Sequence, residues 1–139
     1  MGSKNEPEDA TMAVEGMNHF TILTDDVDGT LDFYDELLGL TAGPRPNFDF
    51  PGAWLYAGGA PILHVIGGRP KSELKPGVID HMAFTGRDLS GTLAKLKARG
   101  IEPTCRRQVG SGVWQVFFFD PNGARVEIDF AADETAPAA

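Results

Sequence analysis

An internal repeat is the feature of this sequence that most restricts its fold. The segment NHFTILTDDVDGTLDFYDELLGL (residues 18–40) aligns with DHMAFTGRDLSGTLAKLKARGI (80–101) at an offset of 62 residues. Further along, LYAGGAPILHVI (55–66) aligns with FFDPNGARVEID (118–129) at an offset of 63. Small loop insertions account for the drift. The repeat therefore predicts one supersecondary unit that is present twice.

Each copy begins with the pattern of a strand followed by a helix. The runs FTILT and MAFT favour short strands, and apolar residues at helical spacing predict helices over about 29–38 and about 90–99. We expect Asp28 and Ser90 to be the N-caps of these helices. Gly39 and Gly100 stand where a left-handed C-terminal glycine belongs.

Extended segments follow each helix, and DPNG (120–123) predicts a turn that joins the last two strands into a hairpin. The predicted fold is α+β, with two βαβββ units forming a curved, partly open mixed β-sheet barrel and the helices outside. The expected strands after the helices are about 41–48, 52–57 and 61–67 in the first copy, and about 102–109, 113–119 and 124–130 in the second.

The chain length of 139 residues suits one domain with a sizeable core. We expect this single domain over residues 16–130, with repeat one at 17–67 and repeat two at 78–130. Residues 1–15 are polar and acidic, and AADETAPAA (131–139) is of low complexity. The first segment is therefore expected to be a disordered tail and the second a C-terminal tail.

The charge and cysteine content exclude several classes of function. The net charge is −8, but residues 16–130 hold 14 acidic and 11 basic residues, a net charge of −3. Because no basic patch is present, we expect no nucleic-acid partner. No apolar run is long enough for a membrane span, so no membrane association is expected. The single cysteine, Cys105, suits a reducing compartment, and the expected location is the cytoplasm.

The repeat aligns residues that could bind a metal. His19 aligns with His81, and His64 aligns with Glu127. A single strand histidine is more often structural than a ligand, and Glu127 alone could be a solvated strand carboxylate. However, these are all three histidines of the chain, and scattered structural histidines have no reason to follow a repeat. Histidine and carboxylate together suit Fe(II), Zn, Ni, Co or Mn, so we expect a divalent metal held by His19, His64, His81 and Glu127.

Four segments also carry a family resemblance. NHFTIL, APILHVIGG, VIDHMAF and VFFFDPNGARVEIDF resemble the vicinal-oxygen-chelate superfamily, which includes glyoxalase I, methylmalonyl-CoA epimerase, extradiol dioxygenases and the bleomycin- and fosfomycin-resistance proteins. The resemblance covers residues 16–130 and implies paired βαβββ units curled around a metal. It matches His19, His81 and Glu127 to ligands on the first, fifth and last strands. His64 falls at the fourth-strand position, where glyoxalase I has Glu and the epimerases have Gln.

Counting ligands separates two enzyme classes. If His64 binds the metal, an octahedral ion keeps two open positions, enough to chelate an enediolate or enolate as glyoxalase-type isomerases and lyases require. If His64 stands off the metal, three positions remain for a catecholate and dioxygen, as in an Fe(II) extradiol ring-cleavage dioxygenase. His64 is then a candidate acid/base, whereas Glu127 is the proton shuttle in the first case. The sequence favours the isomerase or lyase and leaves the dioxygenase open.

A third reading is a non-catalytic binding protein that sequesters a drug or metabolite. The resemblance also implies a homodimer, with the site either within one chain or shared across two. A small-molecule substrate is the partner that we expect. Candidate substrate-binding residues, by charge or aromatic character, are Arg45, Trp54, Tyr56, Arg107 and Trp114.

Overall fold

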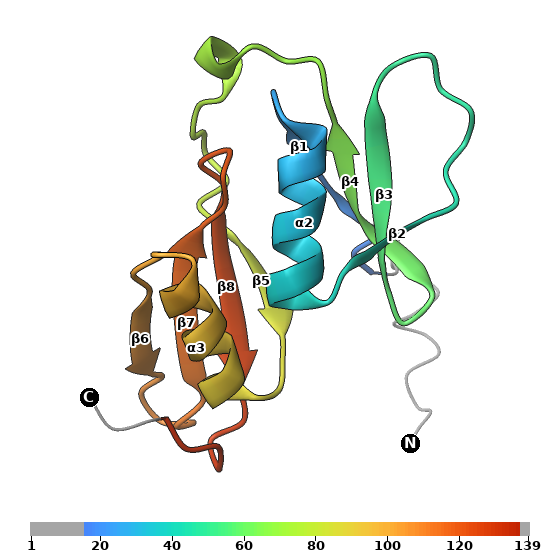
Figure 1. Ribbon diagram of the computed structural model, residues 1–139. Helices are drawn as coiled ribbons and strands as arrows, with labels where there is room; N and C mark the ends of the chain where they lie inside the picture. The colour runs from blue at the N-terminus through green and yellow to red at the C-terminus, as the bar shows by residue number, and fades with distance from the viewer. Residues whose placement is uncertain (1–15, 137–139) are drawn as a thin grey trace.

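The computed structural model of the chain describes residues 16–136, so the expected N-terminal tail lies outside the described residues. The first unit consists of β1 (Phe20–Leu23), α2 (Val27–Leu38), β2 (Thr41–Gly43), β3 (Gly52–Ala57) and β4 (Ala60–Ile66). A short 3-10 helix, η2 (Lys71–Glu73), follows it. The second unit consists of β5 (Met82–Thr85), α3 (Leu89–Ala98), β6 (Thr104–Arg107), β7 (Trp114–Phe119) and β8 (Arg125–Phe130) (Figure 1).

Each unit forms its own four-stranded mixed sheet. The strand orders are β1-β4-β3-β2 and β5-β8-β7-β6, so the first and last strands of each unit lie side by side. That pair is parallel in both sheets, and the remaining pairs are antiparallel. The two βαβββ units and the α+β class are therefore confirmed. The sheets remain separate and do not close into a barrel within one chain (Figure 1).

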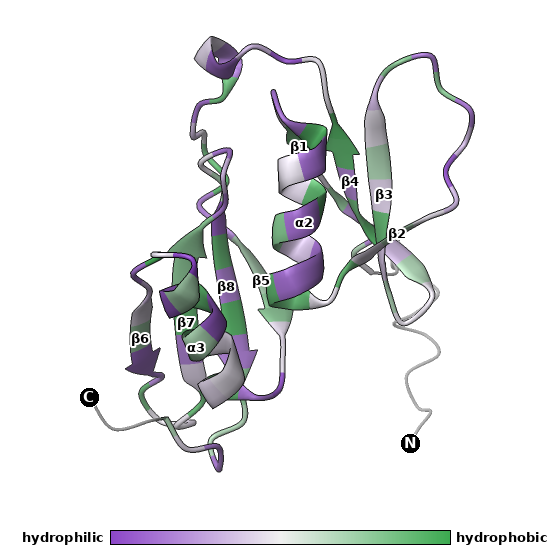
Figure 2. Ribbon diagram, in the orientation of Figure 1, coloured by the Kyte–Doolittle hydropathy of each residue, from purple (hydrophilic) through white to green (hydrophobic). Residues whose placement is uncertain are grey.

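The two faces of each sheet differ in burial. Leu55, Leu63 and Val65 point to the helix side of the first sheet and are almost completely buried. In the second sheet Val116, Phe118, Val126 and Ile128 do the same, and all join one core with α2 and α3. The strands and α2 accordingly alternate between hydrophobic and hydrophilic residues (Figure 2). The opposite faces carry His64 and Glu127 and are called the site faces below. Among residues 16–136, neither α2 nor α3 packs on them (Figure 1).

Both helices begin with the same device, which differs from the predicted one. The N-caps are Asp26 and Asp88, and not Asp28 and Ser90 as predicted. Their carboxylates accept hydrogen bonds from the backbone N–H of Gly29 and Gly91 at 3.0 and 3.1 Å. A Cβ on Gly29 would lie 2.3 Å from an Asp26 carboxylate oxygen, which explains the glycine. Gly39 is left-handed at the end of α2, as predicted.

The DPNG turn joins the second unit to α2 of the first. The hydroxyl of Tyr34 donates to Asp120 Oδ2 at 2.8 Å, and both side chains are buried. Asn122 donates through Nδ2 to Thr30 Oγ1 at 2.9 Å and accepts from Thr24 Oγ1 at 2.6 Å. These contacts connect the turn to α2 and to the loop that precedes it. They hold the units together from the helix side and leave both site faces free.

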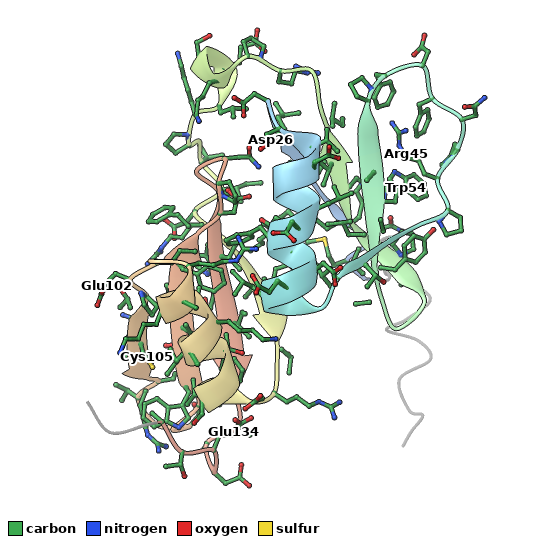
Figure 3. All side chains as sticks on the ribbon, viewed as in Figure 1. Asp26, Arg45, Trp54, Glu102, Cys105 and Glu134 are labelled. Carbon is green, nitrogen blue, oxygen red and sulfur yellow. The ribbon has the colours of Figure 1, made fainter. Side chains whose placement is uncertain are left out.

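Residues 131–136, the described part of the expected C-terminal tail, pack on the second unit. Glu134 accepts hydrogen bonds from the backbone N–H of Asp88 and Leu89 at 3.1 and 2.7 Å. Its carbonyl accepts from Trp114 Nε1 at 2.8 Å. Figure 3 shows Glu134 next to the start of α3. In the described part of the chain, no helix is long and apolar enough to cross a membrane.

Tyr34→Phe should lower the free energy of unfolding by about 1.5–3 kcal/mol, the range for a hydrogen bond to a charged group. The substitution leaves Asp120 Oδ2 buried without its protein donor. Urea denaturation measures the effect. Tyr56→Phe is the matched control, because its hydroxyl makes an exposed hydrogen bond to the Pro44 carbonyl. Equal losses in the two variants would contradict the structural role of Tyr34.

Candidate metal centre

The first pair of candidate ligands, His19 and His64, meets on the site face of the first sheet. Thr21 is the register partner of His64 in the parallel β1–β4 pair. His19 stands two residues before Thr21, so its side chain points to the same face. The imidazole rings stack with their centroids 3.7 Å apart, and Trp54, the β3 partner of His64, stacks on its ring at 4.0 Å.

His64 has a nitrogen atom that is suited to metal binding. Its Nε2 is buried and has no hydrogen-bond partner in the described part of the chain. Burial, followed by the nearby His19, lowers the pKa of His64 below its ordinary value. The neutral imidazole is the form that binds a metal. A buried, unpartnered nitrogen on a neutral ring therefore fits the proposed ion.

The second pair, His81 and Glu127, meets at the equivalent place on the second sheet. Ala83 is the register partner of Glu127 in the parallel β5–β8 pair, and His81 stands two residues before Ala83. His81 Nε2 lies 2.9 Å from Glu127 Oε1, and Gln115 donates to Glu127 Oε2 at 3.1 Å. Glu127 is only 5% exposed, and each of its two oxygens contacts a neighbouring side chain.

Asp129 adds a second carboxyl group beside Glu127. Burial, followed by hydrogen bonding to Glu127 and the charge of Glu127, raises the pKa of Asp129 to about 6. Its Oδ1 is buried without a partner among the described residues. The Asp129 carboxyl group can therefore hold a proton at a pH close to neutral. The first half-site, His19 and His64, contains no carboxyl group.

In both copies, the residue before the histidine orients its ring. Asn18 Oδ1 lies 2.7 Å from His19 Nδ1, and Asp80 Oδ2 lies 2.8 Å from His81 Nδ1. Asp80 is itself held by Arg125 at 2.7 Å. When Nδ1–H donates to these oxygens, Nε2 is the nitrogen left to meet a metal, and in His81 that nitrogen now faces Glu127 Oε1 at 2.9 Å. The repeat thus preserves the histidines and also the groups that select their tautomer.

The two pairs do not converge within one chain. Among residues 16–136, no three His, Cys, Asp or Glu side chains are close enough together to hold a metal ion. A groove of about 670 Å³ lies between β1 and the segment around residues 73–82, and His81 borders it. Each chain therefore presents two half-sites, His19 with His64 and His81 with Glu127.

Comparison with known proteins identifies the family of this chain. The sequence matches the family model of the Glyoxalase/Bleomycin resistance protein/Dioxygenase superfamily over residues 16–128. The chain belongs to this superfamily. "Glyoxylase I 4" of Arabidopsis thaliana is 31% identical over 119 residues, which cover 81% of this chain and 68% of that protein.

Solved structures of the superfamily fold resemble the whole described domain. The fosfomycin resistance protein FosX from Listeria monocytogenes, in complex with Mn(II) and a dihydroxypropylphosphonic acid, has a TM-score of 0.69 at 17% identity. The alignment covers 85% of this chain and 93% of FosX. TnmS3, an antibiotic-binding protein from Streptomyces sp. CB03234, has a TM-score of 0.65 at 21% identity, with 86% and 98% covered. At these identities the likeness concerns the fold alone.

The five predicted substrate-binding residues do not lie together in this glyoxalase-superfamily fold. Trp54 is in the first half-site, and Arg45 lies near it on the β2–β3 loop (Figure 3). Tyr56 anchors that loop, because its hydroxyl donates to the Pro44 carbonyl at 2.5 Å. Arg107 and Trp114 are register partners on the helix side, where the guanidinium lies 4.0 Å from the indole centroid. The structure does not bring these two residues to either half-site.

Strand alternation instead places other residues on the site face of the second sheet. Arg106, the neighbour of Arg107, pairs with Gln115 and lies over the Phe117 ring at 5.0 Å. Arg125 covers the same ring at 4.5 Å. Phe117, Gln115 and Asp129 are not among the site residues predicted from the sequence, although all three share the face of Glu127 in the β7–β8 hairpin. Period-two alternation from Glu127 is the signal that would have found them.

Proposed function

We propose that this protein is a divalent-metal-dependent enzyme of the glyoxalase type, an isomerase or lyase whose small organic substrate binds through two neighbouring oxygens. The observation that carries the proposal is the pair of equivalent half-sites on the site faces. His19 and His64 in one, and His81 and Glu127 in the other, supply three imidazoles and one carboxylate. This donor set suits Fe(II), Zn, Ni, Co or Mn.

The metal, when bound, would act as a Lewis acid on the substrate oxygens. The chain itself supplies the proton chemistry. Glu127 is the residue to move a proton between substrate carbons, because it is buried and fixed by Gln115 and His81. Asp129, with a pKa raised to about 6, can share that proton. Trp54 keeps water from the His64 ring by stacking on it.

An Fe(II) extradiol ring-cleavage dioxygenase is the second candidate. His64 is the residue that distinguishes the two, because its unpartnered Nε2 suits either a ligand or a free acid/base. A lowered pKa keeps the ring neutral and able to accept a proton. Coordination by His64 in a metal-loaded crystal supports the isomerase or lyase, and a His64 that stands off the metal supports the dioxygenase.

A homodimer would complete the site. Because one chain presents two separate half-sites, we infer that the first half-site of one chain faces the second half-site of its partner. Two chains then form two complete sites, each with His19 and His64 from one chain and His81 and Glu127 from the other. The site faces have no helix of the shared core packed on them, which leaves them free for such an arrangement.

Metal analysis tests the proposal without a known substrate. Protein purified without chelators and then reconstituted should hold about one equivalent of divalent metal per chain, because each pair of chains forms two sites. Inductively coupled plasma mass spectrometry measures the content. Less than about a tenth of an equivalent after reconstitution would remove the metalloenzyme and leave a non-catalytic binding protein of the same superfamily.

Mixing variants tests the shared site. When His19→Ala and Glu127→Ala chains are unfolded together and refolded, half of the dimers should be mixed, and each mixed dimer has one intact site. Bound metal should then reach about one quarter of the wild-type content, while each variant alone binds little. A mixture of His19→Ala with His64→Ala is the matched control, because both changes fall in the same half-site and no intact site can form. Equal metal content in the two mixtures would contradict sharing.

Asp80→Ala should weaken metal binding by about 10–100-fold, the usual cost of losing the group that orients a histidine ligand. Asp80→Asn should recover most of the affinity, because the chain already uses an amide, Asn18, at the equivalent place. Competition with a chromogenic chelator measures the dissociation constant. Nitrogen chemical shifts of His81 in the metal-free protein should show a tautomer change in Asp80→Ala only. Unchanged shifts and affinity in that variant would contradict the positioning role.

A further inference from the structure

A row of aromatic side chains continues from the first half-site onto the β2–β3 loop. The rings of His19, His64 and Trp54 are nearly parallel, with successive centroids 3.7 and 4.0 Å apart. Phe48 lies 6.4 Å from Trp54 and stacks on Phe50 at 4.9 Å. Phe48 and Phe50 are 41% and 38% exposed, so they form a pair of adjacent exposed aromatic rings beside the candidate site.

Arg45 completes this row with a positive charge. Its guanidinium lies 5.0 and 5.1 Å from the Phe48 and Phe50 centroids, and Nη2 donates to the Phe50 carbonyl at 2.9 Å. Among residues 16–136, no carboxylate lies within ion-pair distance of it, which it shares with Arg87, Arg106 and Arg107 but not with Arg69, Arg99 and Arg125. Figure 3 shows Arg45 and Trp54 next to each other at this loop.

The loop is anchored, so the row is held in place without a ligand. The Tyr56 hydroxyl binds the Pro44 carbonyl, at the point where the loop leaves β2. A Cβ on Gly52 would lie 3.2 Å from Arg45 Nη2, so the start of β3 leaves room for the guanidinium. The remaining N–H groups of Arg45 can therefore bind a second acceptor at little ordering cost.

We propose that Trp54, Phe48, Phe50 and Arg45, together called the aryl-anion patch, bind a planar aromatic group that carries a negative charge. Aromatic rings favour stacked or edge-on contact with other rings, and a fixed guanidinium without a carboxylate partner favours an anion. The patch adjoins His64 through Trp54, so the bound molecule extends from the half-site onto the loop. It is a substrate only if the proposed metal function holds, in which case the substrate class is an aryl anion with two vicinal oxygens.

Binding to the metal-free full-length protein tests the patch apart from the metal. The probes are 2-naphthoate, neutral 2-naphthamide and cyclohexanecarboxylate, measured by titration calorimetry. We expect 2-naphthoate to bind at least tenfold more tightly than either of the others. Equal affinity for 2-naphthoate and 2-naphthamide would overturn the anion part, and equal affinity for 2-naphthoate and cyclohexanecarboxylate would overturn the aromatic part.

Two substitutions assign the effect to the patch. Arg45→Gln should reduce the ratio of the affinities for 2-naphthoate and 2-naphthamide at least fivefold. The affinity for 2-naphthamide should remain unchanged. Phe48→Leu should lower the affinity for 2-naphthoate and for 2-naphthamide by a similar factor. The controls are Arg106→Gln, on the other sheet, and Phe119→Leu, a 60% exposed phenylalanine outside the patch. Loss of the charge preference in Arg106→Gln with retention in Arg45→Gln would overturn the proposal.

The metal measurement separates the two proposals. Metal binding with no aromatic preference removes the aryl-anion patch and leaves the metalloenzyme. Aromatic preference with no metal removes the metalloenzyme and makes the patch part of a sequestering site. Arg45→Gln and Phe48→Leu should both retain wild-type metal affinity, because neither Arg45 nor Phe48 is a proposed metal ligand.

Discussion

The parallel pairing of the first and last strands in each unit is the contact on which the site depends. It places His19 beside His64 through the Thr21–His64 register, and His81 beside Glu127 through the Ala83–Glu127 register. The same register buries Leu63, Val65, Val126 and Ile128 against the helices. A slip by one residue would turn the ligands to the core and the core residues to the site face. The hydrophobic core therefore fixes the positions of the proposed ligands, and the half-site geometry follows from the energetics of burial.

The two half-sites share geometry but differ in chemistry. The first consists of imidazole and indole rings stacked on one another, and the pKa of its His64 is lowered by burial. Among residues 16–136, Nε2 of His64 has no hydrogen-bond partner. The second is a hydrogen-bonded network in which Glu127 is held by Gln115 and His81, with Asp129 alongside. The repeat accounts for the common strand positions, whereas the side chains around them differ between the two units. The aromatic half suits contact with an aromatic group, whereas the acidic half suits proton transfer.

Sequence patterns predicted the features that occur at equivalent positions in both copies of the repeat. The histidine and glutamate positions, the two units and the DPNG hairpin all follow from aligned residues and local turn chemistry. The N-caps were wrong because several polar residues precede each helix, and only the three-dimensional turn shows that Asp26 reaches the Gly29 N–H. Arg107 was chosen where Arg106 points to the site face, because strand parity depends on register with β7. Phe48 and Phe50 lie in a loop without periodicity, so no pattern identified their contact with Arg45.

The contacts between the units explain how a chain can hold two half-sites apart without losing stability. Tyr34, Asp120 and the Asn122 amide connect α2 with the DPNG turn on the helix side, and Arg99 on the end of α3 pairs with Asp32 and Glu36 of α2. None of these groups lies on a site face. Because these contacts join the two units on the helix side of the sheets, the fold does not require either site face to be buried within the chain. Each face remains available for a partner chain and a substrate, and the half-sites can be completed without rearranging the core.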